Sequence, residues 1–247
     1  MTGRNLALAA ICVGALSACA AEPAPPGQLI ADPYEPFNRR VHAFNVGVDQ
    51  VVLRPAAIAY DTVTPGLFQL LISNAVKHIR LPLVFGNYVL QGDVDQALAT
   101  LGRFGVNTIA GAGGLLDPAT EFGLPYEPTD FGLTLASWGA PEGVFVMLPF
   151  FGPSTGRDVG GRIGDVALNP LTYVTFGDSG AATASMVGQI VAPPIVARSE
   201  NAAIIDEVLY ETEDSYVTVR TGYVLMRRNR VSGGVVDVDA LPDIFAD

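Results

Sequence analysis

The chain has 247 residues, a formal net charge of −11, and 49% hydrophobic against 16% charged residues. This acidity excludes a basic surface for nucleic acid, and it disfavours general attraction to anionic lipid head groups. Because soluble domains are roughly 25% charged, the low charged fraction indicates an apolar medium, which the chain would contact through apolar area.

The N-terminus is typical of a bacterial signal peptide. Arg4 gives a short positive region, and the apolar run from Leu6 to Leu16 is too short to span a bilayer. Leu16-Ser17-Ala18-Cys19 then resembles the lipobox of bacterial lipoproteins, in which the peptide is cut before the cysteine and the thiol is acylated. The alternative is an ordinary signal peptide that happens to contain a cysteine.

The lipobox predicts a signal peptide over 1–18, lipidation of Cys19 and a flexible tether over 19–31. Acyl chains contribute ~0.8 kcal/mol for each CH₂ that they bury, so they would hold the mature chain on a membrane. Ala20 is not the aspartate that often causes retention at the inner membrane, which favours the outer membrane. Cys12 leaves with the signal, so no disulfide is expected within the mature chain.

The folded part opens with Asp32-Pro33-Tyr34-Glu35-Pro36, which suits the N-terminus of a helix. Apolar residues then recur at steps of three and four, while Asn38, Asn45 and Asp49 share another face. We interpret the apolar stripe as the core-facing side, and we expect Pro55 to end the helix. The stripe consists of Phe37, Val41, Phe44, Val48 and Val51.

Two more helices are expected before the middle of the chain. The first runs from Pro65 to Arg80 and is stopped by Leu81-Pro82. The second carries apolar residues at helical spacing from Val94 to Thr108, with Asp93 as its N-cap, and the glycines over 111–114 end it. A loop is predicted over 120–128.

The stretch from Phe131 to Pro153 carries a single charge, on Glu142, yet glycines and prolines interrupt it. Each proline removes a backbone donor, whereas a lipid-exposed span must pair every backbone group internally. The stretch is therefore either a buried core segment or broken apolar backbone that lies at membrane depth inside a protein-walled cavity. Within it, residues 144–151 have the composition of a short buried strand.

A helix is predicted over 154–169, directly after the apolar stretch. Arg157-Asp158 near its start is either a structural ion pair or a polar rim that meets a lipid head group or a partner. Further along, Arg162 and Asp165 are spaced to pair across one turn.

The C-terminal part contains two further apolar segments. Residues 181–196 are apolar, with Pro193-Pro194 as a breaker, and Glu200 to Arg230 is the longest run of helical periodicity. Ser232-Gly233-Gly234 ends this run, and residues 231–247 are predicted to be an acidic mobile tail.

No catalytic or metal centre is expected. Gly152-Pro153-Ser154-Thr155-Gly156 matches the G-x-S-x-G elbow of hydrolases, in which the catalytic histidine follows the serine. Both histidines here, His42 and His78, precede Ser154, so we favour a turn with a helix N-cap at Ser154 or Thr155. The histidines also lack the spacing of a metal-ligand pair, and nothing in the sequence indicates a cofactor.

Motifs spread along the chain resemble, in their order, those of the MlaA (VacJ) lipoproteins. No single motif would suffice, and the resemblance is specific because many fall in the same order from about Asp32 to Arg230. The matching residues are Asp-Pro-Tyr-Glu-Pro-Phe-Asn-Arg at 32–39, Phe44-Asn45, Leu90-Gln91-Gly92, Arg103-Phe104, Asn107-Thr108, Gly111-x-Gly113-Gly114-x-x-Asp117, Asp130-Phe131-Gly132-x-Thr134-Leu135, Trp138-Gly139, Leu148-Pro149-Phe150-Phe151-Gly152-Pro153-Ser154-Thr155-x-Arg157-Asp158 and Asn169-Pro170-Leu171.

The resemblance implies a mainly α fold over 32–230, a ring-shaped bundle of short, broken amphipathic helices around an amphipathic channel. It implies a lipid-anchored protein in the periplasmic leaflet of the outer membrane, which removes mislocalised phospholipids from the outer leaflet and so maintains lipid asymmetry. The phospholipids would pass to a soluble periplasmic carrier resembling MlaC, and the chain would associate with a trimeric porin. No enzymatic activity is implied.

The resemblance also nominates site residues. In the family a helical hairpin near Phe44-Asn45 controls channel opening, so Phe44 and Asn45 are candidates for gating. Asn107, Arg157 and Asp158 are candidates for the polar lining of the channel. The alternative functions are a structural, porin-associated envelope lipoprotein without lipid transport, and a lipid-active hydrolase that uses Ser154. Pro141-Glu142-Gly143 departs from the Gly-Pro pair usual in the family, which leaves the porin and carrier contacts open.

Overall fold

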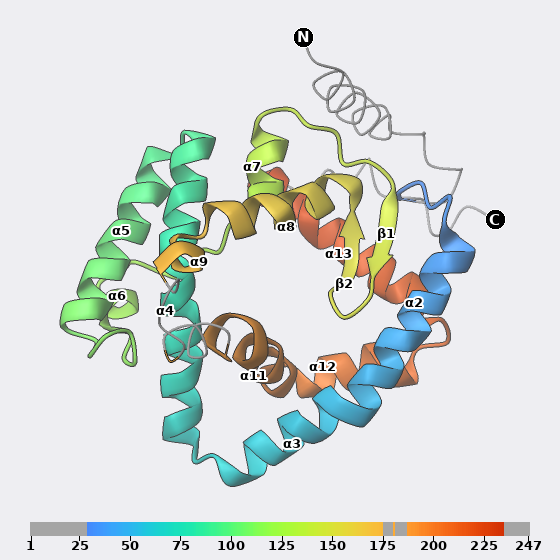
Figure 1. The fold of residues 1–247 in the computed structure, drawn as a ribbon, viewed down its shortest axis with the longest axis horizontal. Coiled ribbons are helices and arrows are strands. Elements are labelled where there is room, and N and C mark those ends of the chain that lie inside the picture. The colour runs from blue at the N-terminus through green and yellow to red at the C-terminus, as the bar shows by residue number, and fades with distance from the viewer. Residues whose placement is uncertain (1–28, 175–179, 181–186, 235–247) are drawn as a thin grey trace.

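The computed structural model describes residues 29–174, 180 and 187–234, in which helices dominate (Figure 1). The first helices are α2 (Glu35–Val48), the π-helix η1 (Asp49–Leu53), α3 (Arg54–Val63), α4 (Gly66–Gln91), α5 (Val94–Ile109), α6 (Pro118–Glu121) and α7 (Phe131–Ser137). Strands β1 (Phe145–Leu148) and β2 (Gly152–Thr155) follow. The remaining elements are α8 (Gly156–Leu168), α9 (Pro170–Val174), η2 (Val187–Val191), α11 (Ala192–Glu200), α12 (Ala202–Asp206), η3 (Glu207–Glu211) and α13 (Ser215–Val231).

The expectation of a mainly α fold built from short, broken helices is confirmed. In Figure 1 the elements follow a circuit from α2 and α3 through α4 and α5 to α7, α8 and α13. This circuit agrees with a ring-shaped bundle. The β1–β2 hairpin points toward its middle, and α11 lies on the inner side of α3 and α4 in this view.

Pro55 does not end the first helix, contrary to the prediction. The π-helix η1 continues directly from α2, and α3 starts at Arg54 with Pro55 in its first turn. A proline is tolerated there because the first backbone N–H groups of an α-helix have no partner within the helix. The helical path therefore continues to Val63.

Pro82 does not stop the next helix either. α4 continues through Pro82 to Gln91, which makes it the longest described helix. An interior proline costs ~3 kcal/mol, but α4 packs along α5 and buries Leu81 and Val84 almost completely on either side of Pro82. Tertiary packing thus outweighs a local helix-breaking signal.

The Pro193-Pro194 pair likewise starts a helix, where the sequence predicted a break. α11 begins at Ala192, directly after the π-helix η2, and holds both prolines in its first turn. The run over 200–230 is in turn divided into α12, η3 and α13. The break between η3 and α13 falls before Asp214. The carboxylate of Asp214 caps α13 by accepting from the backbone N–H of Val217 at 3.2 Å.

Several local predictions are confirmed. Asp93 caps α5, since its carboxylate accepts from the backbone N–H of Gln96 at 3.0 Å. Thr155 caps α8 through the N–H of Asp158 at 3.3 Å. The strand expected within 144–151 is β1, which pairs antiparallel with β2 from Phe145 opposite Thr155 to Leu148 opposite Gly152.

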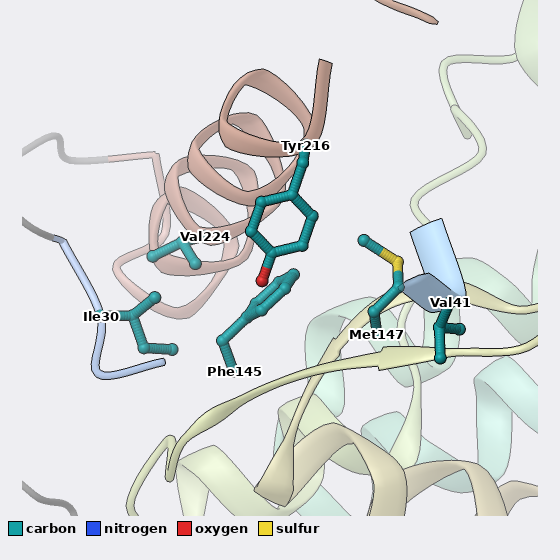
Figure 2. Packing of buried hydrophobic residues seen from close by; sticks show 6 residues of the cluster. All are labelled: Ile30, Val41, Phe145, Met147, Tyr216 and Val224. Atoms are coloured by element: carbon teal, nitrogen blue, oxygen red, sulfur yellow. The ribbon is translucent and has the colours of Figure 1, made fainter. Parts of the chain in front are cut away.

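The main apolar core is small and lies between α2, β1 and α13. Figure 2 shows six buried side chains that converge there from these elements and from the segment before α2. A second cluster joins α4 to α5. The six residues are Ile30, Val41, Phe145, Met147, Tyr216 and Val224.

Helices α7 and α8 cross at glycines that bring their backbones into contact. A Cβ on Gly161 would lie 2.5 Å from the backbone N of Gly132, and one on Gly164 would lie 2.2 Å from the ring of Phe131. This crossing turns one face of α8 toward α7 and leaves the side chains of Ile163 and Val166 exposed.

Gly161→Ala should destabilise the protein although alanine favours helices by ~1 kcal/mol over glycine. The new methyl group meets backbone atoms that cannot rotate away, so we expect a net loss of ~1–3 kcal/mol in the free energy of unfolding. Urea denaturation of the full chain in mild detergent, followed by circular dichroism, measures this loss. Gly160→Ala is the matched control, since its nearest neighbour would be 3.9 Å away; equal stability of the two variants would contradict the close crossing.

Candidate functional site

The described part of the chain buries polar side chains and exposes large apolar ones. In water-soluble domains, charged residues are mostly exposed and are almost never fully buried unless they are paired. The buried polar residues are Asn38, His42, Asp49, Ser73, His78, Asn87, Thr100, Arg103, Asn107, Thr129, Thr134, Ser154, Thr155, Arg157, Asp158, Arg198, Arg220 and Arg227.

Helix α2 shows this inversion most clearly, and it corrects the interpretation of its apolar stripe as core. Phe37 is 61% exposed and Phe44 is 47% exposed, whereas Asn38 is completely buried. Within the stripe only Val41 belongs to the apolar core. The polar face, including Asp49 at its C-terminal end, points inward instead. The outer face of this helix is therefore suited to an apolar medium.

Two asparagines of α2 bind backbone groups of strand β1 and of the turn that follows it. Asn38 donates to the carbonyl of Phe145 at 3.2 Å and accepts from the N–H of Met147 at 2.9 Å. Asn45, two turns further on, donates to the carbonyl of Leu148 at 2.9 Å and accepts from the N–H of Phe150 at 2.8 Å. The side-chain amides thus stand in for a neighbouring strand and satisfy backbone groups that would otherwise remain unpaired.

The turn between β1 and β2 contacts Phe44, the other predicted gating residue. Phe150 in this turn has φ +66°, a left-handed conformation that is strained for a bulky side chain. Its ring packs edge-to-face on Phe44, with 5.1 Å between ring centroids and an interplanar angle of 87°. Phe44 and Asn45 therefore both contact the strained tip of the hairpin, although their role in gating stays a prediction.

A cavity of about 210 Å³ lies between α2, the hairpin and α13. His42 and Asn45 line it from α2, and Phe150 lines it from the hairpin. His42 Nε2 is 2.9 Å from the hydroxyl of Ser215, and burial lowers the pKa of this histidine below its usual value. The imidazole is therefore held neutral at the wall of the cavity.

Arg157 and Asp158, the candidate lining residues on α8, are both buried. Their side chains are 3.7 Å apart, and Arg157 also donates to the carbonyl of Ala140 at 3.4 Å. Asp158 accepts from Arg227 at 2.6 Å and from the hydroxyl of Tyr223 at 2.6 Å. The sequence indicated the Arg157-Asp158 pair. It did not indicate the partners of Asp158 on α13, which lie more than 60 residues further along the chain.

Arg227 joins two acidic residues from different elements. It bonds Asp130, the N-cap of α7, at 2.6 and 3.0 Å, in addition to Asp158 on α8. Burial alone would raise the pKa of Asp130, but the hydrogen bonds and the charge of Arg227 outweigh burial and lower it. Burial and the bond to Asp158 raise the pKa of Tyr223, so its hydroxyl stays protonated and donates.

Asn107, the remaining candidate lining residue, holds the glycine-rich loop after α5. It donates to Asp117 at 2.9 Å and accepts from the backbone N–H of Ala119 at 3.0 Å. Arg103 binds the same Asp117 at 2.5 Å. Burial would raise the pKa of Asp117, but the bonds from Asn107, Thr120 and Arg103 lower it. The polar atoms of Asn107 are thus engaged within the protein, and its contact with a channel stays a prediction.

Two further buried ion pairs, which the sequence did not predict, join the N-terminal and C-terminal parts of the described chain. Arg198 on α11 bonds Asp49 at 2.9 Å, and Tyr210 donates to the same carboxylate at 2.7 Å. Arg220 on α13 bonds Asp32 at 2.8 Å. The polar face of Asn38, Asn45 and Asp49 was a signal in the sequence, although nothing there named the distant partners.

The position of Ser154 gives no support to a hydrolase. Its side chain is completely buried in β2 and lies 3.5 Å from the carbonyl of Thr155. Within the described ranges, no three His, Cys, Asp or Glu side chains form a group that could hold a metal ion. In the same ranges, no helix has the length and apolarity needed to cross a membrane.

Some predictions fall outside the residues that the structure describes. These are the signal peptide over 1–18, the lipidation of Cys19, most of the tether over 19–31, and the tail beyond Gly234. The start of the predicted tail is described: Val231 ends α13, and Ser232 caps it.

Comparisons with known proteins agree with this architecture. A family model described as MlaA lipoprotein matches residues 30–230. The intermembrane phospholipid transport system lipoprotein MlaA of Escherichia coli (strain K12) is 34% identical over 220 residues, which cover 87% of this chain and 84% of that protein. A Rickettsia felis protein without an assigned function is 37% identical over 78% of this chain and 74% of its own length.

A solved structure supports the same relationship. It comes from work on the structural basis for maintenance of bacterial outer membrane lipid asymmetry. It is 32% identical in sequence and superposes with a TM-score of 0.66, over 82% of this chain and 99% of the solved one. Sequence and fold therefore agree that the chain belongs to the MlaA lipoprotein family.

Proposed function

We propose that this chain is an outer-membrane lipoprotein that removes mislocalised phospholipids from the outer leaflet and passes them to a periplasmic carrier. The E. coli relative is named as a lipoprotein of an intermembrane phospholipid transport system, and the similar solved structure was determined in work on outer membrane lipid asymmetry. The chain covers most of that relative, so the comparison concerns nearly the whole protein.

The inverted polarity of the fold is the observation that carries the proposal. Exposed apolar residues such as Phe37, Phe68 and Ile109 come from three different helices, and such faces insert into a leaflet without crossing the bilayer. Polar groups face inward, where irregular backbone at membrane depth is tolerated because protein or water surrounds it. A phospholipid head group could then travel inside while its acyl chains stay near lipid.

The anchor and the partners form part of the proposal. Acylated Cys19 and the tether over 19–31 hold the protein to the periplasmic leaflet of the outer membrane. A trimeric porin supports it laterally, and a soluble carrier resembling MlaC receives the phospholipid. Phe44 and Asn45 regulate opening through the hairpin tip, while Asn107, Arg157 and Asp158 contribute polar groups near the path. No bond is made or broken in this transfer, so the activity is not enzymatic.

Deletion of the gene in the native bacterium should raise the amount of phospholipid in the outer leaflet and increase sensitivity to detergent. Enzymatic labelling of surface-exposed phospholipid measures the first effect, and growth on sodium dodecyl sulfate with a chelator measures the second. Wild-type chain supplied on a plasmid should reverse both. A deletion strain with normal lipid asymmetry and weakened porin assembly would instead identify a structural envelope lipoprotein without lipid transport.

A further inference from the structure

An apolar groove lies between the hairpin tip and α8. Its volume is about 580 Å³, within the range of about 300–1,000 Å³ usual for small-molecule sites. Its side chains are apolar apart from one arginine, and no carboxylate is among the described residues that line it. The walls are formed mainly by Leu148, Phe151, Val159, Ile163 and Val166, with Arg162 between them.

Arg162 is left without the partner that its helix offers. The sequence predicted a pair with Asp165 one turn on, but Asp165 accepts from Asn87 at 3.1 Å and from the N–H of Phe131 at 2.9 Å. Asp158, one turn back, is occupied by Arg227. Among the described residues, Arg162 makes no ion pair within 4.0 Å, so that prediction is wrong.

The guanidinium of Arg162 lies over an aromatic wall of the groove. Its central carbon is 5.5 Å from the centroid of the Phe151 ring, a cation–π distance that holds the charge beside apolar surface. Arginine in such a position binds phosphate through two parallel hydrogen bonds. A hydrocarbon surface next to one unpaired cation complements a molecule with a hydrocarbon chain next to one anion.

We propose that this groove holds an acyl chain of a phospholipid and that Arg162 binds its phosphate. The proposal rests on the proposed function and assigns Arg162 as a binding residue for the transported lipid. Because no carboxylate lines the groove, an amine on the head group finds no charged partner there. Recognition therefore depends on the phosphate and is indifferent to whether the head group carries ethanolamine or glycerol.

Lipid binding to the purified full chain tests this assignment. Native mass spectrometry from mixed micelles would compare phosphatidylethanolamine, phosphatidylglycerol and diacylglycerol with identical acyl chains. Wild-type protein should bind both phospholipids within about 3-fold of each other and bind diacylglycerol about 10-fold more weakly, as expected for the loss of a charge-assisted contact. Equal binding of diacylglycerol and phospholipid would overturn the proposal.

Variants separate the phosphate contact from the apolar contact. Arg162→Gln should weaken phospholipid binding about 10-fold and leave diacylglycerol binding unchanged, and Arg162→Lys should weaken it less because one charge remains. Ile163→Asn in the groove wall should weaken binding of all three lipids alike. Arg40→Gln removes another exposed arginine and should change nothing. An equal loss of phospholipid binding in Arg40→Gln, or no loss in Arg162→Gln, would contradict the assignment.

The experiments distinguish failure of the groove assignment from failure of the proposed function. If deletion of the gene leaves lipid asymmetry intact, the transport proposal fails whatever the groove binds. If deletion disturbs asymmetry while Arg162→Gln binds phospholipid like wild type, the groove assignment fails alone. In cells, Arg162→Gln should restore asymmetry only in part when it replaces the wild-type gene.

Discussion

Arg227→Met should lower the free energy of unfolding by about 3–5 kcal/mol, the largest loss that we expect from a single substitution. The change removes the 2.6 Å contact to the buried carboxylate of Asp158, which keeps only the longer contact of 3.7 Å to Arg157. It also removes both hydrogen bonds to Asp130. Methionine fills a similar volume, so the loss reflects uncompensated charge more than a cavity. Urea denaturation of the full chain in mild detergent measures it.

The neighbouring Arg228 provides the control on the same helix. Arg228 also forms an ion pair, with Glu142 at 2.9 Å, but its side chain is 42% exposed. Exposed pairs contribute about 0–1 kcal/mol, so Arg228→Met should cost little. If the two variants lost equal stability, the buried cluster around Arg227 would not hold α7, α8 and α13 together.

The loss of unfolding free energy caused by Arg227→Met should become smaller as the pH falls. In the wild type the pKa of Asp130 is lowered, so its contribution is present above the ordinary value of 3.8 and is lost as the pH falls through the lowered pKa. Without Arg227, burial is the largest remaining influence on Asp130 and favours its neutral form, so protonation at lower pH reduces the cost of the substitution. The stability difference between wild type and variant should therefore be smaller at pH 5 than at pH 8.

Asn45→Ala should cause the largest functional effect of a single substitution at the hairpin. It removes two hydrogen bonds to Leu148 and Phe150, each worth ~0.5–1.5 kcal/mol. These bonds hold a turn in which Phe150 is strained, so their loss should raise the population of a displaced hairpin tip by ~10–100-fold. If the tip regulates the lipid path, cells should accumulate outer-leaflet phospholipid and become sensitive to detergent.

A matched asparagine on α4 controls for the loss of a side-chain amide. Asn74 donates to the carbonyl of Leu115 at 3.1 Å, and Asn74→Ala should leave asymmetry unchanged. Phe44→Ala should have a smaller effect than Asn45→Ala, because an edge-to-face aromatic pair contributes ~0.5–1.5 kcal/mol beyond its buried area. Normal asymmetry in an Asn45→Ala strain with wild-type protein levels would refute a gating role for this residue.

Local chemistry in the sequence was enough to predict several structural features. The caps at Asp93 and Thr155, the strand within 144–151 and the end of the last helix before Ser232 all appear in the structure. The caps depend on one residue and its immediate neighbours, so no distant contact is needed to produce them. The order of motifs along the chain likewise identified the family.

The prolines were misinterpreted because the sequence did not show their place in a helix or the packing around it. Pro82 lies inside α4 because α4 packs along α5, and Pro55 and Pro193 lie in the first turns of helices that follow π-helical segments. A proline removes one hydrogen bond wherever it lies, but whether that loss breaks a helix depends on the packing around it. For Pro82 that packing comes from α5, the next helix along the chain.

The sequence by itself determined that α2 has an apolar and a polar face, and only the tertiary structure decided which one is buried. Helical periodicity separates the two faces without saying what surrounds the helix. Asn38, Asn45 and Asp49 turn inward because β1, Arg198 and Tyr210 supply their partners, and Phe37 and Phe44 are consequently left outside. Those partners come from more than 100 residues away, so the burial of the polar face is a property of the assembled fold.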